Sequence, residues 1–296
     1  MESLVLIVLT GLGIGSLYFL LASGLALIFG LMNVLSFAHG AVLSLCGYIA
    51  WSVMQTAGSE PTWGRFLVAL ATAIAVGALL SYLMELLVLR RLFGRSLEQL
   101  LATVGLGIAM VALMQGIWGS DERLMPLPAW FSEVTAVGPV VVPNNRFVIV
   151  GAALVVLGLL LLFLSKTRQG IIIRAGVENR EMVGALGVNA QRSFSIVFAL
   201  AGALAGLGGG LVLVLYRAIH PALGDSVLIF AFIVLIVGGI GSIAGAALAA
   251  AGLGLTQALA NFYIAPGIGD LFIAGALVIT LLVRPSGLLG KKVRLA

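Results

Sequence analysis

The sequence predicts an all-α fold, a polytopic membrane bundle of eight or nine transmembrane helices in a single domain spanning residues 1–296. Its composition is the first reason, because 61% of the residues are hydrophobic and only 9% are charged. A soluble domain is roughly 45–50% apolar and about 25% charged. The apolar residues also form long runs, and a helix needs about 20 of them to cross a bilayer. Finally, these runs lack the alternation of membrane-spanning strands, so helices must satisfy the backbone.

The apolar runs can be followed in order along the chain. Five are clear, at residues 4–30, 66–89, 100–119, 146–165 and 194–216. Residues 34–54 form a more polar candidate, and whether this segment crosses fully decides between eight and nine helices. Residues 227–284 predict two or three shorter spans, interrupted by "GGIGS" at 238–242 and "APGIGD" at 265–270. The longest external loop, about 120–145, is Pro-rich and too short for a core of its own.

Most basic residues fall on one side of the predicted membrane. Twelve of the 16 lie in three segments on that side: Arg90, Arg91, Arg95; Lys166, Arg168, Arg174, Arg180, Arg192; and Arg284, Lys291, Lys292, Arg294. The positive-inside rule makes this side cytoplasmic, so the C-terminus is predicted in the cytoplasm. The net charge of +5 therefore reflects orientation in a membrane and gives no reason to expect a nucleic-acid partner.

The stretch "LMNVLSFAHG" at 31–40 places polar side chains in an apolar region. On a helix, with about 100° per residue, one narrow stripe collects small and polar residues. Its members are Asn33, Ser36, Gly40, Ser44 and Gly47, and His39 lies about 60° beyond its edge. Polar groups inside a membrane protein are candidates for a translocation pathway. The alternative is ordinary hydrogen bonding between helices, worth about 0.6 kcal/mol per contact.

Small residues predict where helices approach closely, because lipid tails give apolar helices no other reason to associate. Gly202, Gly206 and Gly210 recur every four residues and predict a packing face. The pairs Gly11/Gly15 and Gly241/Gly245 have the same spacing but could arise by chance among 39 glycines. Glu85 is the only acid deep in a clear span, and we expect it to snorkel to the cytoplasmic surface.

The longest polar segment on the cytoplasmic side is the loop 166–193, which contains "RAGVENREMVGALGVNAQR". Glu178 and Glu181 precede an apolar stretch, and Gly187 stands where a helix would stop, a pattern that predicts a short amphipathic helix. The loop could also rest on anionic lipid through its arginines. It resembles the coupling motif of ATP-binding-cassette importer permeases of the branched-chain amino acid (leucine/isoleucine/valine) type. Similar stretches of that family are "GLMNVLSFAHG" (30–40), "LLATVGLG" (100–107), "GGIGSIAGA" (238–246) and "LLVRPSGLLG" (281–290).

The resemblance implies a permease subunit, not an enzyme, in the plasma membrane of a bacterium, the inner membrane if Gram-negative. It implies as partners a homologous second permease, in a heterodimer, with two cytoplasmic ATPase subunits and an external substrate-binding protein. ATP and Mg would be bound by the ATPase, with no cofactor in this chain. The sequence agrees, since it contains no G-x-x-x-x-G-K-[ST] phosphate loop. Ser36 and Ala41 depart from the family pattern, which leaves the substrate open between branched-chain amino acids and a related small solute.

The resemblance also assigns roles to residues. Residues 176–187 would dock on the ATPase, with these candidate contacts: Glu178, Asn179, Arg180, Glu181, Met182, Gly184, Leu186 and Gly187. The polar stripe and the broken segment after it in the chain would border the translocation pathway, as half-helix ends do in other transporters. The candidates are Asn33, Ser36, His39, Gly40, Ser44, Gly238, Gly239, Gly241, Ser242 and Gly245.

Two other classes of protein compete with this interpretation. A secondary transporter or channel driven by an ion gradient should carry intramembrane acids, and Glu85 is the one clear case. An intramembrane enzyme needs a nucleophile with an oriented base or a metal cluster. The chain has only two histidines, His39 and His220, and nothing in the pattern orients either of them. We therefore expect no catalytic residues and no metal site.

Overall fold

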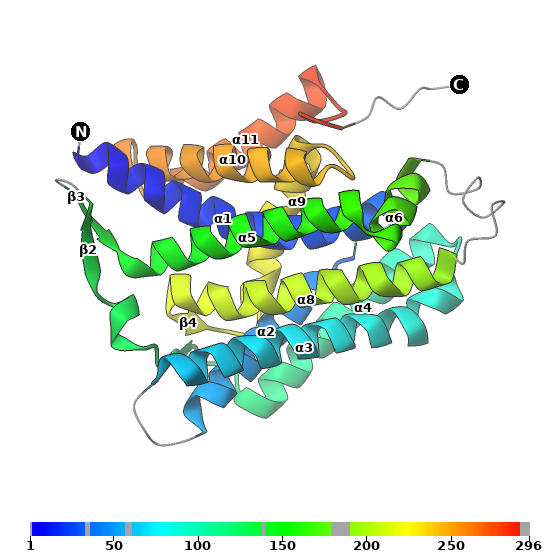
Figure 1. Cartoon of the computed structure of the whole chain (residues 1–296), viewed down its shortest axis with the longest axis horizontal. Coiled ribbons are helices and arrows are strands. Elements are labelled where there is room, and N and C mark those ends of the chain that lie inside the picture. Colours follow the sequence, from blue (N-terminus) through cyan, green and yellow to red (C-terminus); the bar gives the residue numbers. More distant parts are fainter. Residues whose placement is uncertain (1, 33–35, 57–60, 138–139, 179–189, 291–296) are drawn as a thin grey trace.

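A computed structural model describes residues 2–32, 36–56, 61–137, 140–178 and 190–290. Within these residues the chain forms ten α-helices (Figure 1). They are α1 Glu2–Met32, α2 Ala38–Gln55, α3 Trp63–Leu87, α4 Ser96–Trp118, α5 Asn144–Lys166, α6 Arg168–Glu178, α8 Ala190–Tyr216, α9 Leu223–Gly238, α10 Ile243–Tyr263 and α11 Ile268–Val283. Two 3₁₀ turns, η1 Leu89–Leu92 and η2 Ala129–Phe131, and four short strands complete the described part.

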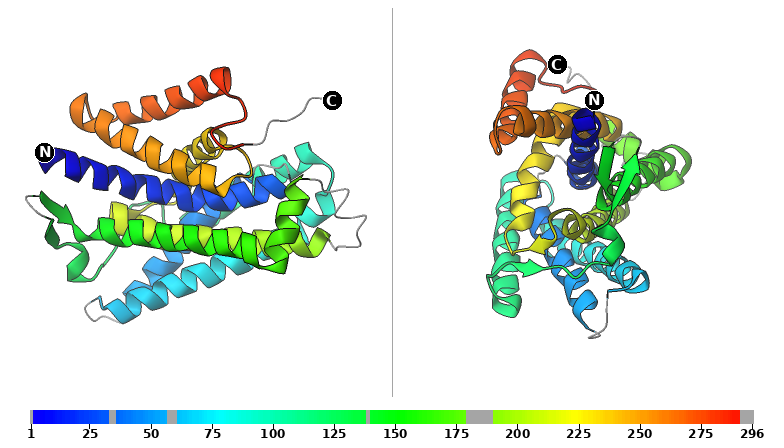
Figure 2. Two further views of the ribbon diagram at one scale, coloured as in Figure 1. Left: turned by 45° about the horizontal axis from the view of Figure 1, so that its top comes forward. Right: turned by 90° about the vertical axis from the view of Figure 1, so that its left-hand side faces the viewer.

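The helices are those of a multi-pass membrane protein. By length and composition six described helices can cross a bilayer, namely α1, α3, α4, α5, α8 and α10, and α9 and α11 are shorter apolar helices. Together with these two shorter helices and the more polar α2, the six long helices give a number close to the predicted count of eight or nine. The start of α1 and the end of α11 lie toward opposite ends of the bundle (Figures 1 and 2), as an odd number of crossings requires.

Helices α1 and α8 form the centre of the bundle, and α4 and α5 lie at its periphery (Figure 2). In the most apolar stretch of α8, 72% of the residues are buried, against 17% in α4 and 22% in α5. Large apolar side chains such as Leu101, Ile108, Leu154 and Leu159 are therefore exposed on the outside. In a membrane these side chains contact lipid or another membrane subunit, so their exposure carries no penalty from water.

Close contacts at glycines confirm the packing face predicted on α8. A Cβ atom on Gly202 would collide with the backbone of Gly77 in α3, and one on Gly206 would lie 2.8 Å from the carbonyl carbon of Ala73. Gly11 makes a similar approach, since its Cβ would lie 2.8 Å from the carbonyl oxygen of Gly254 in α10. Both helix pairs thus meet backbone to backbone, which only small residues allow.

The segment 120–145, which the sequence predicts to be an external loop, contains more regular structure than expected. Strands β2 Val134–Val137 and β3 Val140–Pro143 pair antiparallel, with Val134 opposite Pro143. Strands β1 Arg123–Leu124 and β4 Ala218–Ile219 also pair antiparallel, which joins this segment to the connection between α8 and α9. The Pro content favoured a loop, but tertiary packing against the helix ends supplies partners for these short strands.

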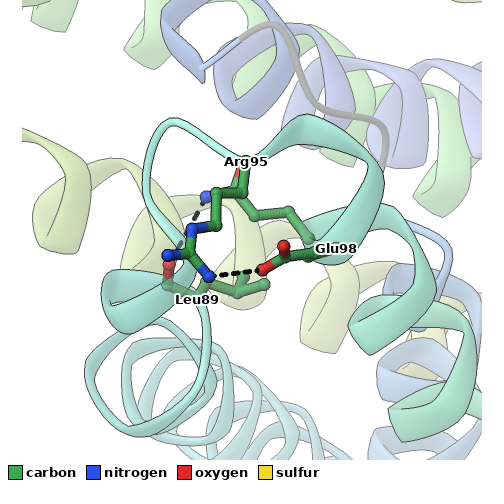
Figure 3. A network of polar contacts seen from close by, with 4 residues as sticks. Leu89, Arg95 and Glu98 are labelled. Carbon is green, nitrogen blue, oxygen red and sulfur yellow. Dashed lines mark hydrogen bonds and ion pairs between the residues drawn. The ribbon is translucent and has the colours of Figure 1, made fainter.

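Helices α3 and α5 end, and α4 and α8 begin, at the other end of the bundle (Figure 1). Basic residues lie in or beside these helix ends in the sequence. The eight basic residues of the three predicted segments that the structure describes are Arg90, Arg91, Arg95, Lys166, Arg168, Arg174, Arg192 and Arg284. Figure 3 shows one of them, Arg95, whose Nη1 donates to Oε2 of Glu98 at 3.1 Å. We refer to this end as the basic end.

The prediction for Glu85 is wrong. Its side chain is only 2% exposed, so the carboxylate does not reach the surface. The hydroxyl of Ser195 in α8 donates a hydrogen bond to Oε2 of Glu85 at 2.7 Å. The close packing of α3 on α8 explains the difference, because it covers Glu85 and brings a polar partner to a group that would otherwise have to reach water.

Candidate functional site

The polar stripe on α2 lies inside the bundle. Ser36 precedes α2, whereas His39, Gly40 and Ser44 lie on it; all four residues are buried, and Asn33 lies outside the described residues. The hydroxyl oxygen of Ser44 accepts a hydrogen bond from the backbone N–H of Gly224 at 2.7 Å. A Cβ atom on Gly40 would lie 2.7 Å from the carbonyl oxygen of Gly224. The stripe therefore holds α2 against the first turn of α9, and its role in a translocation pathway stays a prediction.

His39 lies where α1, α2 and α8 meet. Its side chain is 2% exposed, and a Cβ atom on Gly24 of α1 would lie 2.9 Å from its Nε2. Within the described residues this nitrogen has no hydrogen-bond partner. A buried polar atom without a partner is costly, so the packing of three helices holds the imidazole in an unfavourable place.

A groove of about 480 Å³ lies on the outside of this stripe, between α4 and α9. Its wall is largely apolar and is formed by Phe37, Val104, Gly107, Ile108, Val111, Ala112, Gln115, Asp225, Leu228, Ile229 and Phe232. Two polar side chains, Gln115 and Asp225, come from the ends of α4 and α9 that are remote from the basic end. At the other end of the groove the rings of Phe37 and Phe232 approach to 5.2 Å between centroids. We call this cavity the α4–α9 groove.

Sequence reasoning missed the residues of this groove. The predicted residues nearest to it, Ser36 to Ser44, lie behind its wall, which only their neighbour Phe37 joins. The signal that could have found Asp225 is an acid in the first turn of a short apolar helix. Gln115 is likewise a polar residue near the end of an apolar run. Intramembrane polar residues of this kind are functional candidates by default.

The turn between α9 and α10 contains the other predicted pathway residues. Gly239 and Gly241 have φ angles of +101° and +79°, a backbone region that favours glycine. The hydroxyl oxygen of Ser242 accepts a hydrogen bond from the N–H of Gly245 at 3.0 Å and so caps α10. A Cβ atom on Gly238 would lie 2.6 Å from the carbonyl oxygen of Gly245. These residues close a tight turn at the basic end, and their contact with a solute stays a prediction.

The segment after α11 is bound to this turn. The N–H of Leu288 donates to the carbonyl oxygen of Val237 at 2.8 Å, and that of Leu289 donates to Gly238 at 3.0 Å. A Cβ atom on Gly239 would lie 2.6 Å from the Cα atom of Gly290. The two glycine-rich stretches "GGIGSIAGA" and "LLVRPSGLLG" therefore form one structural unit, although more than 30 residues separate them.

A chain of hydrogen bonds that the sequence did not suggest joins three helices. The hydroxyl of Tyr18 in α1 donates to Oε1 of Gln257 in α10 at 3.0 Å. Nε2 of Gln257 donates in turn to Oδ1 of Asp270 in α11 at 2.7 Å. Tyr18 also stacks on Phe230 of α9, with 5.0 Å between ring centroids. Gln257 thus satisfies polar groups on both of its neighbours in a largely apolar region.

Comparison with known proteins identifies the family. The family model described as "Branched-chain amino acid transport system / permease component" matches residues 7–282. The chain belongs to this family. The permease is 32% identical to the high-affinity branched-chain amino acid transport system permease protein BraD of Pseudomonas aeruginosa, over 95% of this chain and 94% of the relative. It is 27% identical to LivH of Escherichia coli K12, again over 95% and 94%. A probable LivH permease of Methanocaldococcus jannaschii is 31% identical, over 93% and 89%.

The family-like stretches of the permease meet in space in pairs. The first stretch, at 30–40, contacts the second, at 100–107: the N–H of Phe37 donates to Oγ1 of Thr103 at 3.3 Å. A Cβ atom on Gly107 would lie 3.5 Å from the Cα atom of Ala38. The stretches at 238–246 and 281–290 form the second pair, as described above. One pair borders the α4–α9 groove and the other lies at the basic end.

Most of the predicted coupling segment of the permease lies outside the described residues. Of its candidate contacts only Glu178 is reached, as the last residue of α6. Sequence analysis did not predict α6 itself, although a capping signal was present. The hydroxyl oxygen of Thr167 accepts a hydrogen bond from the N–H of Gly170 at 3.0 Å, and Ile173 is 2% exposed. Helix α6 is therefore anchored at its start and on one buried side chain, and it ends at Glu178, directly before the rest of the predicted coupling segment in the sequence.

Replacement of Gln257 by leucine is expected to destabilise the permease by about 1–3 kcal/mol, because it leaves the hydroxyl of the buried Tyr18 without its partner. It also removes the hydrogen bond to Asp270, whose side chain is exposed. The midpoint of thermal unfolding in detergent, followed by size-exclusion chromatography, measures the effect. Thr256→Val is the control, since its hydroxyl donates only to the carbonyl oxygen of Gly252 in the same helix. Equal midpoints for the two variants would contradict the structural role of Gln257.

Proposed function

We propose that the permease is the membrane subunit of an importer for branched-chain amino acids or a related small solute, and that the α4–α9 groove forms one wall of the translocation route. The groove is the observation that supports this most directly. Its apolar wall suits an aliphatic side chain, and the carboxylate of Asp225 can attract an ammonium group at the external end. The relatives are named for branched-chain amino acid transport, which gives the substrate class.

A homologous second permease subunit would close the groove from outside. The groove lies between two helices whose outward faces are apolar, with Ile108 66% exposed and Ile229 60% exposed. A polar solute cannot travel along a wall that faces lipid, because its charged groups would be unsatisfied there. A protein partner is therefore needed on the open side, and a heterodimer of related permeases provides one.

The orientation follows from the basic end, which the positive-inside rule assigns to the cytoplasm. The C-terminal end of α11 and the coupling segment then lie in the cytoplasm, and the start of α1 lies outside. The membrane would be the bacterial plasma membrane, which is the inner membrane of a Gram-negative cell. In this orientation Gln115 and Asp225 face the side from which an external substrate-binding protein would deliver the solute.

Energy would come from two cytoplasmic ATPase subunits, which bind ATP and Mg. Residues 176–187 would dock on an ATPase, with Glu178, Arg180 and Glu181 making polar contacts and Met182 and Leu186 supplying apolar anchorage. Asn179 would add a further polar contact, and Gly184 and Gly187 would allow close approach and a turn. Motion of the docked segment would reach the membrane through α6, which packs directly on α5.

Import of leucine into proteoliposomes should therefore require all subunits and ATP, and import by the permease alone without nucleotide would overturn the proposal.

The double substitution Glu181→Lys and Leu186→Asp is expected to reduce recovery of the ATPase with the purified permease by about tenfold or more, because it reverses one contact and places a charge in the apolar anchorage. Quantitative co-purification through a tag on the permease measures this. A matched control changes Leu97→Asp and Glu98→Lys, two exposed residues at the same end of the bundle. Wild-type recovery of the ATPase with the first double variant would refute the docking role.

A further inference from the structure

A second cavity, of about 850 Å³, lies at the basic end of the permease. The end of α1, the end of α5, helix α6, the α9–α10 turn and the segment after α11 all contribute to its wall. We call it the basic-end cavity. It is separate from the α4–α9 groove, and its wall includes Gly241 and Ser242, whose contact with a solute stays a prediction.

The chemistry of this wall is that of an amphiphile site. Apolar side chains dominate, and three of them remain substantially exposed: Leu161 at 40%, Ile240 at 46% and Leu289 at 50%. Among the described residues of the wall, Arg174 on α6 is the one charged side chain, and the hydroxyls of Ser242 and Ser286 add hydrogen-bonding groups. A ligand that satisfies this wall needs an anionic polar head and a long apolar part.

The surroundings of the cavity point to the membrane as the source of that ligand. Lys166 is the last residue of α5 and Arg168 is the first residue of α6, so two further basic residues are close in sequence to residues of the cavity wall. Arg284 precedes the wall residue Pro285 in the segment after α11. Anionic lipid of the cytoplasmic leaflet concentrates at such basic surfaces, and basic pockets between membrane helices on this side bind anionic headgroups.

We propose that the basic-end cavity binds one anionic phospholipid, with the headgroup phosphate at Arg174 and the acyl chains against the wall at Leu161, Ile240 and Leu289. The inference rests on the proposed orientation of the basic end toward the cytoplasm. The bound lipid joins α6, which leads into the coupling segment, to the α9–α10 turn. It therefore braces α6, through which force from an ATPase would pass, against this turn.

Photocrosslinking tests the site directly. The complete complex is placed in nanodiscs that contain a photoactivatable phosphatidylglycerol or, separately, a photoactivatable phosphatidylcholine, and crosslinked peptides are mapped by mass spectrometry. We expect crosslinks in the wall segments, at least about fivefold more with phosphatidylglycerol, and an about fivefold loss of that excess in Arg174→Gln. Arg95→Gln is the control, because Arg95 lies at the same end, pairs with Glu98 (Figure 3) and is not part of the cavity wall.

Other outcomes would overturn the proposal. Equal crosslinking by the two lipids, unchanged in Arg174→Gln, would mean ordinary lipid contact without recognition. Crosslinks that appear only after deletion of residues 291–296 would mean that the chain's own C-terminus fills the cavity. Both leaflets of a nanodisc carry the same lipid, so the crosslinking result does not depend on which side of the membrane the basic end faces in the cell. Loss of this site with ATP-dependent import intact would leave the proposed function standing.

Discussion

Replacement of Gly206 by isoleucine is expected to prevent stable assembly of the bundle. A Cβ atom at this position would lie 2.8 Å from the carbonyl carbon of Ala73 and 2.9 Å from the Cα atom of Ile74. Both are backbone atoms of α3, so no side chain can turn aside to make room. The two helices must separate, and separation also uncovers Glu85 beside Ser195. We expect a cost of about 3 kcal/mol or more, the upper part of the range for overpacking, which is a large fraction of the stability of most proteins.

The yield of monodisperse permease from the membrane fraction and its thermal midpoint measure this effect. Gly158→Ile is the matched control, because Gly158 lies within α5, is exposed, and has no atom near the position of an added Cβ. Both substitutions add the same β-branched side chain to a membrane helix, so helix propensity cancels in the comparison. A Gly206→Ile variant that matches Gly158→Ile in yield and midpoint would show that α3 and α8 tolerate separation.

The sequence allowed the long helices to be predicted because their signal is local. The runs at 66–89, 100–119, 146–165 and 194–216 differ from α3, α4, α5 and α8 by at most four residues at either end. A span of about 20 apolar residues is required by the thickness of the bilayer alone. The four-residue spacing of Gly202, Gly206 and Gly210 is local in the same sense, since it defines a face whatever the partner helix is.

The identity of the partner helix is what the sequence could not supply. The stripe on α2 was recognised, but a stripe of small and polar residues serves equally for helix packing and for a water-filled route. Its partner proved to be the first turn of α9 at Gly224, which is 180 residues from Ser44. Asp225 and Gln115 stand alone in their apolar runs, and only the tertiary structure places them in one groove.

Substitution of Ala112 by tryptophan is expected to reduce solute import by about tenfold or more, the factor that a barrier raised by about 1.4 kcal/mol gives. Ala112 lies in the wall of the α4–α9 groove, between Ile108 and Gln115 along one face of α4. An indole at this point occupies space that the solute needs between Asp225 and the Phe37–Phe232 pair. The rate of ATP-dependent leucine uptake into proteoliposomes containing the complete importer measures the effect.

Leu113→Trp is the control, because Leu113 is exposed on the same helix but is not part of the groove wall. Co-purification of the second permease is measured for both variants, since a bulky residue could act on subunit contact instead of on the route. Loss of import with both subunits still paired supports the groove as a wall of the route. Loss of pairing in Ala112→Trp alone would make the groove a contact surface between permeases, and unchanged import would place the route elsewhere. The comparison therefore separates conduction from assembly, the two roles open to an apolar groove in a membrane subunit.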